Sequence, residues 1–243
     1  MRSLALFSVK GGVGKSALAV NLAHASATIS GRRSLLWDLD PQGAATWTLR
    51  MAPKSGAKAR KAIASGELSA LIQPSTHANL DVLPADQSLR RLEAQLAGDD
   101  RTKRLKKLLK TLENDYDRII LDCPPGLTEL ADQVLRAVDM LVVPVVPSAL
   151  SLRAFDQLRV HLDAEHKGHA PALLPVFSMA DRRKALHREA MAGQPDWPVI
   201  PYAAAIERMA ASQQPVLAGA PRSAAGQAIA ALWAEVERRL LTP

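Results

Sequence analysis

Short apolar runs alternate with longer amphipathic segments along most of this chain. The runs are rich in Leu, Val and Ile, which is typical of strands buried on both faces, and the segments between them carry apolar residues at helical spacing. This alternation predicts an α/β fold, a doubly wound and mostly parallel sheet with helices on both faces. The predicted strands lie near 3–9, 34–39, 79–84, 118–123, 139–146, 172–179 and 198–201. The predicted helices span 16–30, about 86–112, 128–137, 150–166, 182–192, 203–213 and 223–241.

The pattern contains no internal repeat and no long linker. Segment 52–66 is the most irregular part, and we expect it to be an exposed excursion from the fold. The last predicted helix carries an apolar stripe from Ile229 to Leu240 that would pack on the sheet. We therefore interpret residues 1–243 as a single domain, long enough for a substantial core.

The first predicted strand leads into a glycine-rich heptapeptide, Lys-Gly-Gly-Val-Gly-Lys-Ser, which opens the first predicted helix. A glycine-rich turn at a helix N-terminus directs backbone N–H groups at a phosphate, and the helix dipole adds to the attraction. In such a loop the lysine before the helix reaches the β- and γ-phosphates, and the following hydroxyl ligates Mg²⁺. The predicted nucleotide-binding residues are Gly11, Gly12, Val13, Gly14, Lys15, Ser16 and Ala17.

The loop departs from the general P-loop pattern at its start. Val9 stands where that pattern has glycine, and a second lysine, Lys10, follows it. We interpret Lys10 as a cation supplied across a dimer to the nucleotide of the partner, in the manner of an arginine finger. The alternative is that Lys10 is a solvated loop lysine.

Three aspartates follow predicted strands. Asp38 and Asp40 lie at the end of the second strand, and Asp122 lies at the end of the fourth. Ligands of a doubly wound sheet bind at the carboxyl ends of its strands, so we expect these carboxylates beside the P-loop. Asp38 and Asp40 would share one face if their strand continued regularly. One could then help hold hydrated Mg²⁺ while the other positions the attacking water. An aspartate that closes a strand can instead cap the next helix.

These motifs together resemble the deviant-Walker ATPases of the ParA/MinD family, and the ParA side more closely. Besides the loop, the resemblance rests on 35–43 (LLWDLDPQG) and 117–126 (DRIILDCPPG), with further strand matches at 79–85 and 142–145. It implies a P-loop NTPase fold that binds ATP and Mg²⁺.

The resemblance also implies roles for individual residues. Lys10, Lys15 and Asp40 would be catalytic, with Asp40 orienting the water. Asp38 would lie nearer the metal, and Asp122 would contact Mg²⁺ through water, as a Walker B acid does.

The same resemblance places the adenine beside two later segments. One is 177–183, in which Met179, Asp181 and Arg182 keep the family's pattern, whereas Ser178 and Ala180 stand where threonine and tyrosine are commoner. The other is the loop around Pro201, which would close the opposite side of the base. Adenine rather than guanine is implied by the resemblance alone.

Charge points to a polyanionic partner. The chain has 31 Lys and Arg against 24 Asp and Glu, a formal net charge of +7, which favours nucleic acid or an acidic membrane surface. Basic residues cluster at Lys54–Lys61, Arg101–Lys110 and Arg182–Arg188, although the middle cluster also fits a solvated face of a core-packed helix. The resemblance implies non-specific DNA binding through phosphate contacts by C-terminal residues. The residues predicted to bind DNA are Arg182, Arg183, Lys184, Arg188, Arg208 and Arg222.

Other functions of this fold fit the sequence less well. A MinD-like membrane-associated ATPase requires a basic amphipathic C-terminal helix. The last residues of this chain instead include two acids, two arginines and a final proline. An iron protein of the nitrogenase type needs two cysteine ligands per subunit, and Cys123 is the only cysteine. A metabolic ATP-dependent ligase of the dethiobiotin-synthetase type remains an alternative. It would not be expected to carry Asp-Pro-Gln-Gly after the second strand or a basic surface.

The sequence thus predicts a cytoplasmic, nucleoid-associated ParA-like ATPase. The single cysteine suits a reducing compartment, and no apolar stretch is long enough to span a membrane. A strand that begins at Met1 leaves no room for a secretion signal or a helix-turn-helix extension. By resemblance, ATP would drive formation of a homodimer that holds DNA. A ParB-like protein or cargo adaptor would stimulate hydrolysis, and the cycle would position DNA or a protein cargo.

Overall fold

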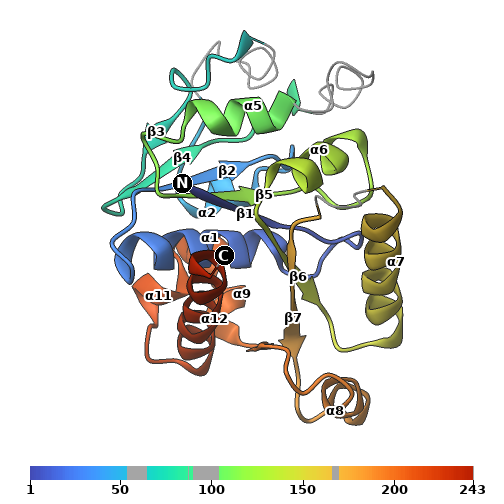
Figure 1. The fold of residues 1–243 in the computed structure, drawn as a ribbon. Helices are drawn as coiled ribbons and strands as arrows, with labels where there is room; N and C mark the ends of the chain where they lie inside the picture. The colour runs from blue at the N-terminus through green and yellow to red at the C-terminus, as the bar shows by residue number, and fades with distance from the viewer. Residues whose placement is uncertain (54–64, 87, 90–103, 166–169, 243) are drawn as a thin grey trace.

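A computed structural model of the chain describes residues 1–53, 65–86, 88–89, 104–165 and 170–242. Within them, eight strands form one sheet in the order β3-β4-β2-β5-β1-β6-β7-β8 (Figure 1). All neighbouring strands are parallel except β3, which pairs antiparallel with β4. The strands are β1 (Arg2–Leu6), β2 (Ser34–Asp38), β3 (Gln73–Pro74), β4 (Leu80–Leu83), β5 (Arg118–Asp122), β6 (Met140–Val145), β7 (Ala172–Ala180) and β8 (Val199–Pro201).

Helices cover both faces of this sheet, so the predicted doubly wound α/β fold is confirmed (Figure 1). The longer ones are α1 (Lys15–Thr28), α5 (Arg104–Thr111), α6 (Glu129–Ala137), α7 (Ala149–Glu165), α8 (Ala185–Ala192) and α12 (Ala224–Leu241). The short ones are α2 (Ala44–Thr48), α9 (Ala204–Glu207), α10 (Met209–Ser212) and α11 (Val216–Gly219).

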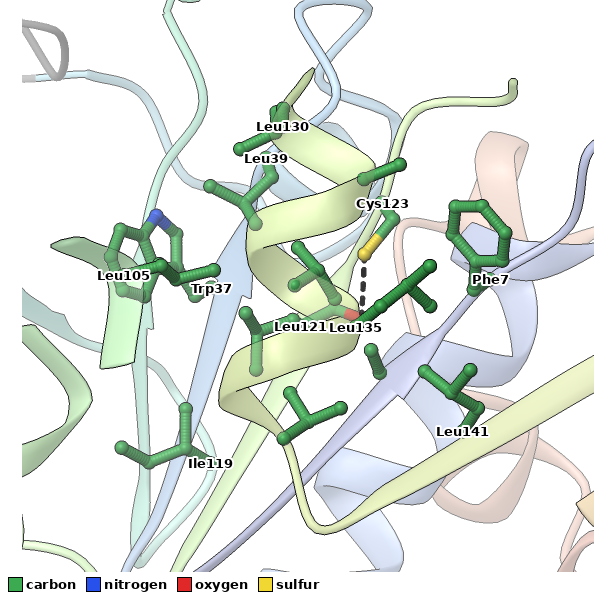
Figure 2. Packing of buried hydrophobic residues seen from close by; sticks show 14 of the residues in the cluster. Phe7, Trp37, Leu39, Leu105, Ile119, Leu121, Cys123, Leu130, Leu135 and Leu141 are labelled. Carbon is green, nitrogen blue, oxygen red and sulfur yellow. Dashed lines mark hydrogen bonds between the residues drawn. The ribbon is translucent and has the colours of Figure 1, made fainter. Parts of the chain in front are cut away.

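One face of the sheet packs against α5, α6 and α7. Figure 2 shows this core, where Leu105 of α5 lies beside Trp37 of β2, and Leu135 of α6 lies over Leu121 of β5. Cys123 belongs to the same cluster as a free, buried thiol, with its Sγ 4.0 Å from the carbonyl oxygen of Leu121. This cysteine therefore packs as a small apolar residue in the core.

The opposite face packs against α1 and α12. The apolar stripe of α12, from Ile229 to Leu240, is buried as predicted. Two polar contacts fix this helix. The indole N–H of Trp233 donates to Ser30 Oγ at 2.8 Å, and Glu237 pairs with the buried Arg118 guanidinium at 2.8 Å.

Several element boundaries differ from the predicted ones. β1 ends at Leu6 and β2 ends at Asp38, because the chain turns there to bring the following loops to the sheet edge. The predicted helix over 203–213 is instead two short helices, α9 and α10, and α8 begins at Ala185 rather than at 182. The elements β3, α2 and α11 were not predicted.

Two sequence predictions lie partly outside the described residues. Of the helix predicted over about 86–112, positions 87 and 90–103 lie outside them, and the last part is α5. The leucines of α5 are buried while Lys106, Lys107 and Lys110 are exposed, so this helix has a solvated basic face over a packed one. Residues 54–64 of the predicted excursion, with the first basic cluster, also lie outside the described part.

Candidate nucleotide-binding site

The glycine-rich loop leaves β1 and enters α1 at the carboxyl edge of the sheet. Gly12 has a φ of 72° and Gly14 a φ of 90°, a left-handed conformation that favours glycine. Gly14 is also confined by space, since a Cβ there would lie 3.0 Å from Ser178 Oγ. Because Gly14 has no side chain to cap α1, the first N–H groups of this helix are left for an external anion.

Asp122 closes β5 directly behind this loop. It is fully buried, and neither carboxylate oxygen finds a hydrogen-bond partner among the described residues. Burial and the charge of Asp38 raise the pKa of Asp122 well above its usual range, while Ser16 and the ammonium of Lys15 act in the opposite direction. A buried carboxyl without a partner is costly, and such sites are often where a ligand or ion supplies the missing interaction.

Asp38 lies beside Asp122 in the β2–β5 register, but its carboxylate is occupied. One oxygen accepts hydrogen bonds from the backbone N–H and the hydroxyl of Thr46, at 2.9 and 2.7 Å. The other accepts the backbone N–H of Asp40 at 3.1 Å. Burial raises the pKa of Asp38 to about 6 despite these bonds. Asp38 therefore matches the helix-capping alternative, because its carboxylate accepts a backbone N–H of α2 and anchors that helix.

Asp40 occupies the turn between β2 and α2. Its carboxylate accepts the backbone N–H of Gln42 at 2.9 Å, and its side chain is half-buried. The expectation that Asp38 and Asp40 share one strand face is wrong, because the strand ends at Asp38 and the chain turns. The half-buried carboxylate of Asp40 is the more accessible of the two, which suits contact with water.

The residues at this edge fit a magnesium nucleotide. Lys15 is 6% exposed, and a cation so deeply buried needs an anionic partner. Among the described residues, no three side chains of His, Cys, Asp or Glu converge into a metal cage. Mg²⁺ keeps several waters and is bound through few protein ligands and the phosphates of a substrate. Ser16 would supply the direct ligand and Asp122 the contact through water.

A cavity of about 100 Å³ lies beside the start of α1. It brings together two predicted base-binding residues from separate strands, Met179 of β7 and Pro201 of β8. Met179 has a φ of 55°, next to an irregularity in the β7–β8 pairing, so its backbone is strained where it meets the cavity. The cavity is lined by Gly14, Ala17, Leu18, Ser178, Met179, Ile200, Pro201, Tyr202, Ala203, Ile206 and Glu207.

The third predicted base-binding residue, Asp181, is engaged elsewhere. Its two carboxylate oxygens accept a pair of hydrogen bonds from the Arg183 guanidinium, each of 2.9 Å, which lowers the pKa of Asp181 to about 2. Glu207 lines the cavity instead and accepts the hydroxyl of Tyr202. Ile206 and Glu207 were missed by the sequence reading, because only the fold of α9 brings them to the base side of the P-loop.

Lys10 stands at the outer rim of the loop. Its side chain is exposed, whereas Val13 beside it is buried against α7. The loop after β5 approaches the same rim, since the Gly126 N–H donates to the Ser8 carbonyl oxygen at 3.4 Å. The side chain of Lys10 is thus accessible from outside the molecule, and its contact with a second subunit stays a prediction.

The predicted DNA-binding residues are all exposed, but they do not lie on one element. Arg182, Arg183 and Lys184 precede α8 and Arg188 lies within it, whereas Arg208 joins α9 to α10 and Arg222 precedes α12. The Arg188 guanidinium donates to the carbonyl oxygens of Arg182 and Arg183, at 3.0 and 3.1 Å, which holds the four basic residues near α8 together.

Comparison with known proteins agrees with this geometry. Residues 1–173 match the family model of an AAA domain. The chromosome-partitioning ATPase Soj of Thermus thermophilus is 32% identical over 251 residues, which covers 99% of this chain and 97% of that protein. This chain belongs to the ParA/MinD family of P-loop ATPases.

Two further matches bear on what this ParA/MinD family member does. The sporulation initiation inhibitor Soj of Bacillus subtilis is 37% identical over 166 residues, or 64% of this chain, and the match spans only 62% of the length of that relative. A solved cobyrinic acid a,c-diamide synthase of Mycobacterium smegmatis, with ADP and magnesium bound, is 27% identical with a TM-score of 0.80, covering 100% of this chain and 96% of that one. The chain is thus similar both to partitioning ATPases and to a solved synthase.

The described residues contain no helix that is both long and apolar enough to cross a membrane.

Proposed function

We propose that this protein is a Mg-ATPase that partitions or positions a cargo by an ATP-driven cycle on DNA. The observation that carries the ATPase assignment is the fully buried carboxyl of Asp122, which accepts no hydrogen bond among the described residues, beside the buried Lys15 of the glycine-rich loop. Neither the carboxyl of Asp122 nor the side chain of Lys15 has an evident structural purpose, and a magnesium nucleotide would provide a partner for both.

In the proposed mechanism, the loop N–H groups and Lys15 bind the phosphates and Ser16 faces the metal. The metal would supply charge neutralisation on the terminal phosphates. Asp40, which is half-buried in the turn after β2, orients the attacking water. Asp38 holds α2 through Thr46 and thereby keeps the turn that carries Asp40 in place.

Dimerisation is proposed to complete the site. Lys10 is exposed on the rim of the loop, so it can approach the nucleotide of a second subunit. ATP would favour the dimer because its terminal phosphate is then contacted from both sides. In this family member, Lys10 therefore acts as a trans cation, and a partner protein of the ParB or cargo-adaptor type would stimulate hydrolysis.

DNA is the proposed surface on which the cycle runs, which would make the protein nucleoid-associated in the cytoplasm. The support is the net charge of +7 and the exposed basic residues around α8, together with the kinship to chromosome-partitioning ATPases. Contacts to phosphates alone predict affinity that falls steeply with salt.

The test is retention of the purified protein on non-specific duplex DNA with ATP, with ADP and without nucleotide, at low and moderate salt. We expect retention with ATP only, and less of it at moderate salt. Asp40→Ala should remain on DNA after ATP is added, because it cannot turn over, whereas Lys10→Ala should bind ATP without forming the dimer or hydrolysing it. Hydrolysis without DNA retention in any state would contradict the DNA part of the proposal.

A second candidate is a metabolic ligase, favoured by the synthase of Mycobacterium smegmatis. A ligase consumes ATP only when its organic acid substrate is present. ATP hydrolysis by the purified protein that is stimulated by DNA, with no organic acid added, separates the two candidates.

A further inference from the structure

A single short segment connects the base side of the cavity to the helix that follows the Asp40 turn. Its first part, Ala203 to Glu207, lines the cavity. Its second part, α10, packs against α2 on the same side of the sheet. The P-loop is not part of this connection, so the segment is a separate route between the two ends of the site.

Three hydrogen bonds tie α2 to this segment. The indole N–H of Trp47 donates to the Ala210 carbonyl oxygen at 3.0 Å, and the Gln213 amide donates to the Trp47 carbonyl oxygen at 3.0 Å. The Arg50 guanidinium donates to the Ser212 carbonyl oxygen at 3.1 Å. Gln213 adopts a φ of 50°, which a non-glycine residue rarely does without compensating contacts.

Burial does not explain the position of Trp47. Its side chain is 60% exposed, so the indole contributes little to the core, and its hydrogen bond to α10 is its specific contact with the segment. An exposed tryptophan whose indole N–H donates to a neighbouring helix links the two helices and adds little to packing. We call this link between Trp47 and α10 the tether.

The other side of α2 is tied to the catalytic turn. Thr46, next to Trp47, holds Asp38, and Asp38 in turn accepts the backbone N–H of Asp40. The Gly43 N–H donates to the Asp40 carbonyl oxygen at 2.9 Å. Each step from Trp47 to Asp40 is therefore a hydrogen bond or a covalent neighbour.

The segment itself turns about a fixed point on α1. The fully buried Asn21 donates to the sulfur of Met209 at 3.1 Å and accepts the Val216 N–H at 2.8 Å. Asn21 anchors both ends of the stretch from 209 to 216. A bound base that displaces the cavity wall at α9 would therefore also shift α10 about this anchor.

We infer that Trp47 is a positioning residue that couples occupation of the base cavity to the placement of Asp40. This inference rests on the proposed ATPase function and deepens it. The base of the nucleotide would raise the rate of hydrolysis through the contacts of Trp47, in addition to raising the affinity. The coupled ligand is a nucleoside triphosphate whose base fills the cavity beside Met179 and Pro201.

The test compares Trp47→Phe with the wild type on two substrates, Mg-ATP and the magnesium complex of inorganic tripolyphosphate, which has no base. We expect kcat for ATP to fall about 3- to 10-fold, the size of one lost hydrogen bond, with KM unchanged. The kcat for tripolyphosphate should not change. Gln213→Ala cuts the tether from its other side, so Gln213→Ala combined with Trp47→Phe should lose no more than the stronger single variant.

Trp197→Phe is the matched control. Trp197 is half-buried and packs against Phe155 and Phe177, each with ring centroids 4.9 Å apart, without contact to α2. We expect it to keep the kcat of the wild type on both substrates. An equal fall of kcat on ATP and tripolyphosphate in Trp47→Phe would reveal a merely structural role, and no fall would equally overturn the inference.

Tryptophan emission separates failure of the coupling from failure of the proposed function. The emission that Trp47→Phe removes should change when ATP or ADP binds to the wild type and should not change with tripolyphosphate. A wild type that hydrolyses no ATP but shows this base-dependent change would overturn the ATPase proposal and uphold the tether. ATP binding with no change in Trp47 emission would overturn the tether alone.

Discussion

The two ends of the candidate site are built in opposite ways. At the phosphate end, one continuous heptapeptide and the last residue of β5 provide the glycines, the lysine and the carboxyl, and the oxygens of that carboxyl accept no hydrogen bond among the described residues. At the base end, four separate segments make an apolar cavity, and the polar groups around it are paired with one another, as in Asp181 with Arg183 and Tyr202 with Glu207.

Under the proposed function, the two ends contribute differently to ligand binding. The buried carboxyl of Asp122 accepts no hydrogen bond among the described residues, and a bound magnesium nucleotide would remove this cost, so we expect the phosphate end to determine whether a ligand binds at all. The paired polar groups at the base end need no ligand, so that end adds affinity through shape and apolar contact. Changes at the phosphate end should therefore have the larger effects.

The largest effect is expected for Lys15→Ala. Removing the buried ammonium should weaken ATP binding about 100-fold or more, as truncation of one partner in a buried charge pair does. Titration calorimetry with ATP measures this, and Lys106→Ala, an exposed lysine of α5, is the matched control that should bind as the wild type does. Retention of tight ATP binding by Lys15→Ala would refute the P-loop assignment.

Asp122→Asn should change Mg²⁺ affinity without lowering thermal stability. Neutralising this buried carboxyl removes repulsion from Asp38, so Tm of the nucleotide-free protein should not fall. Mg²⁺ affinity in the presence of ATP should fall about 10- to 100-fold, the usual cost of losing an outer-sphere contact. Thermal unfolding and magnesium titration check the two halves; lower stability with unchanged Mg²⁺ dependence would show that the carboxyl is structural.

At the base end, Ile206→Ala should raise KM for ATP about 10-fold through lost apolar contact in the cavity. Binding of inorganic tripolyphosphate should not change, since it does not enter the cavity. Leu217→Ala is a suitable control, because this half-buried leucine packs against the same core outside the cavity. If Ile206→Ala weakened the binding of ATP and of tripolyphosphate equally, the proposed difference between the two ends would be contradicted.

The smallest effect concerns a part of α1 that serves neither end. His24 is buried against the ring of His77, with centroids 4.7 Å apart, and burial followed by the charge of His77 lowers the pKa of His24 to about 4. Between the ordinary value of 6.5 and about 4, the unfolded chain binds a proton that the folded protein does not. Stability should therefore fall as pH falls through this window.

We expect Tm to fall between pH 7 and pH 5 in both proteins. The fall should be about 2–4 °C larger in the wild type than in His24→Gln, which corresponds to about 1 kcal/mol in a chain of this size. ATP binding at pH 7 should be the same in both. A pH dependence of Tm that is equally steep in His24→Gln would assign the effect to other groups.

Local sequence was sufficient for the phosphate end. The heptapeptide from Lys10 to Ser16 fixes a strand–turn–helix on its own, because its glycines permit left-handed φ values and its spacing places the lysine at the helix start. The alternation of apolar runs likewise specified the doubly wound sheet, since buried parallel strands and amphipathic helices have different periods. Asp122 was predicted at its strand end for the same reason.

Contacts between residues far apart in the chain could be found only from the packed fold. No local pattern brings Ile206 of α9 to the cavity beside Ala17 of α1. The tether from Trp47 to Ala210 spans 163 positions of sequence and depends on how α10 packs against α2. Motifs encode backbone conformation over a few residues, whereas the choice among several possible hydrogen-bond partners is made by packing of the whole fold.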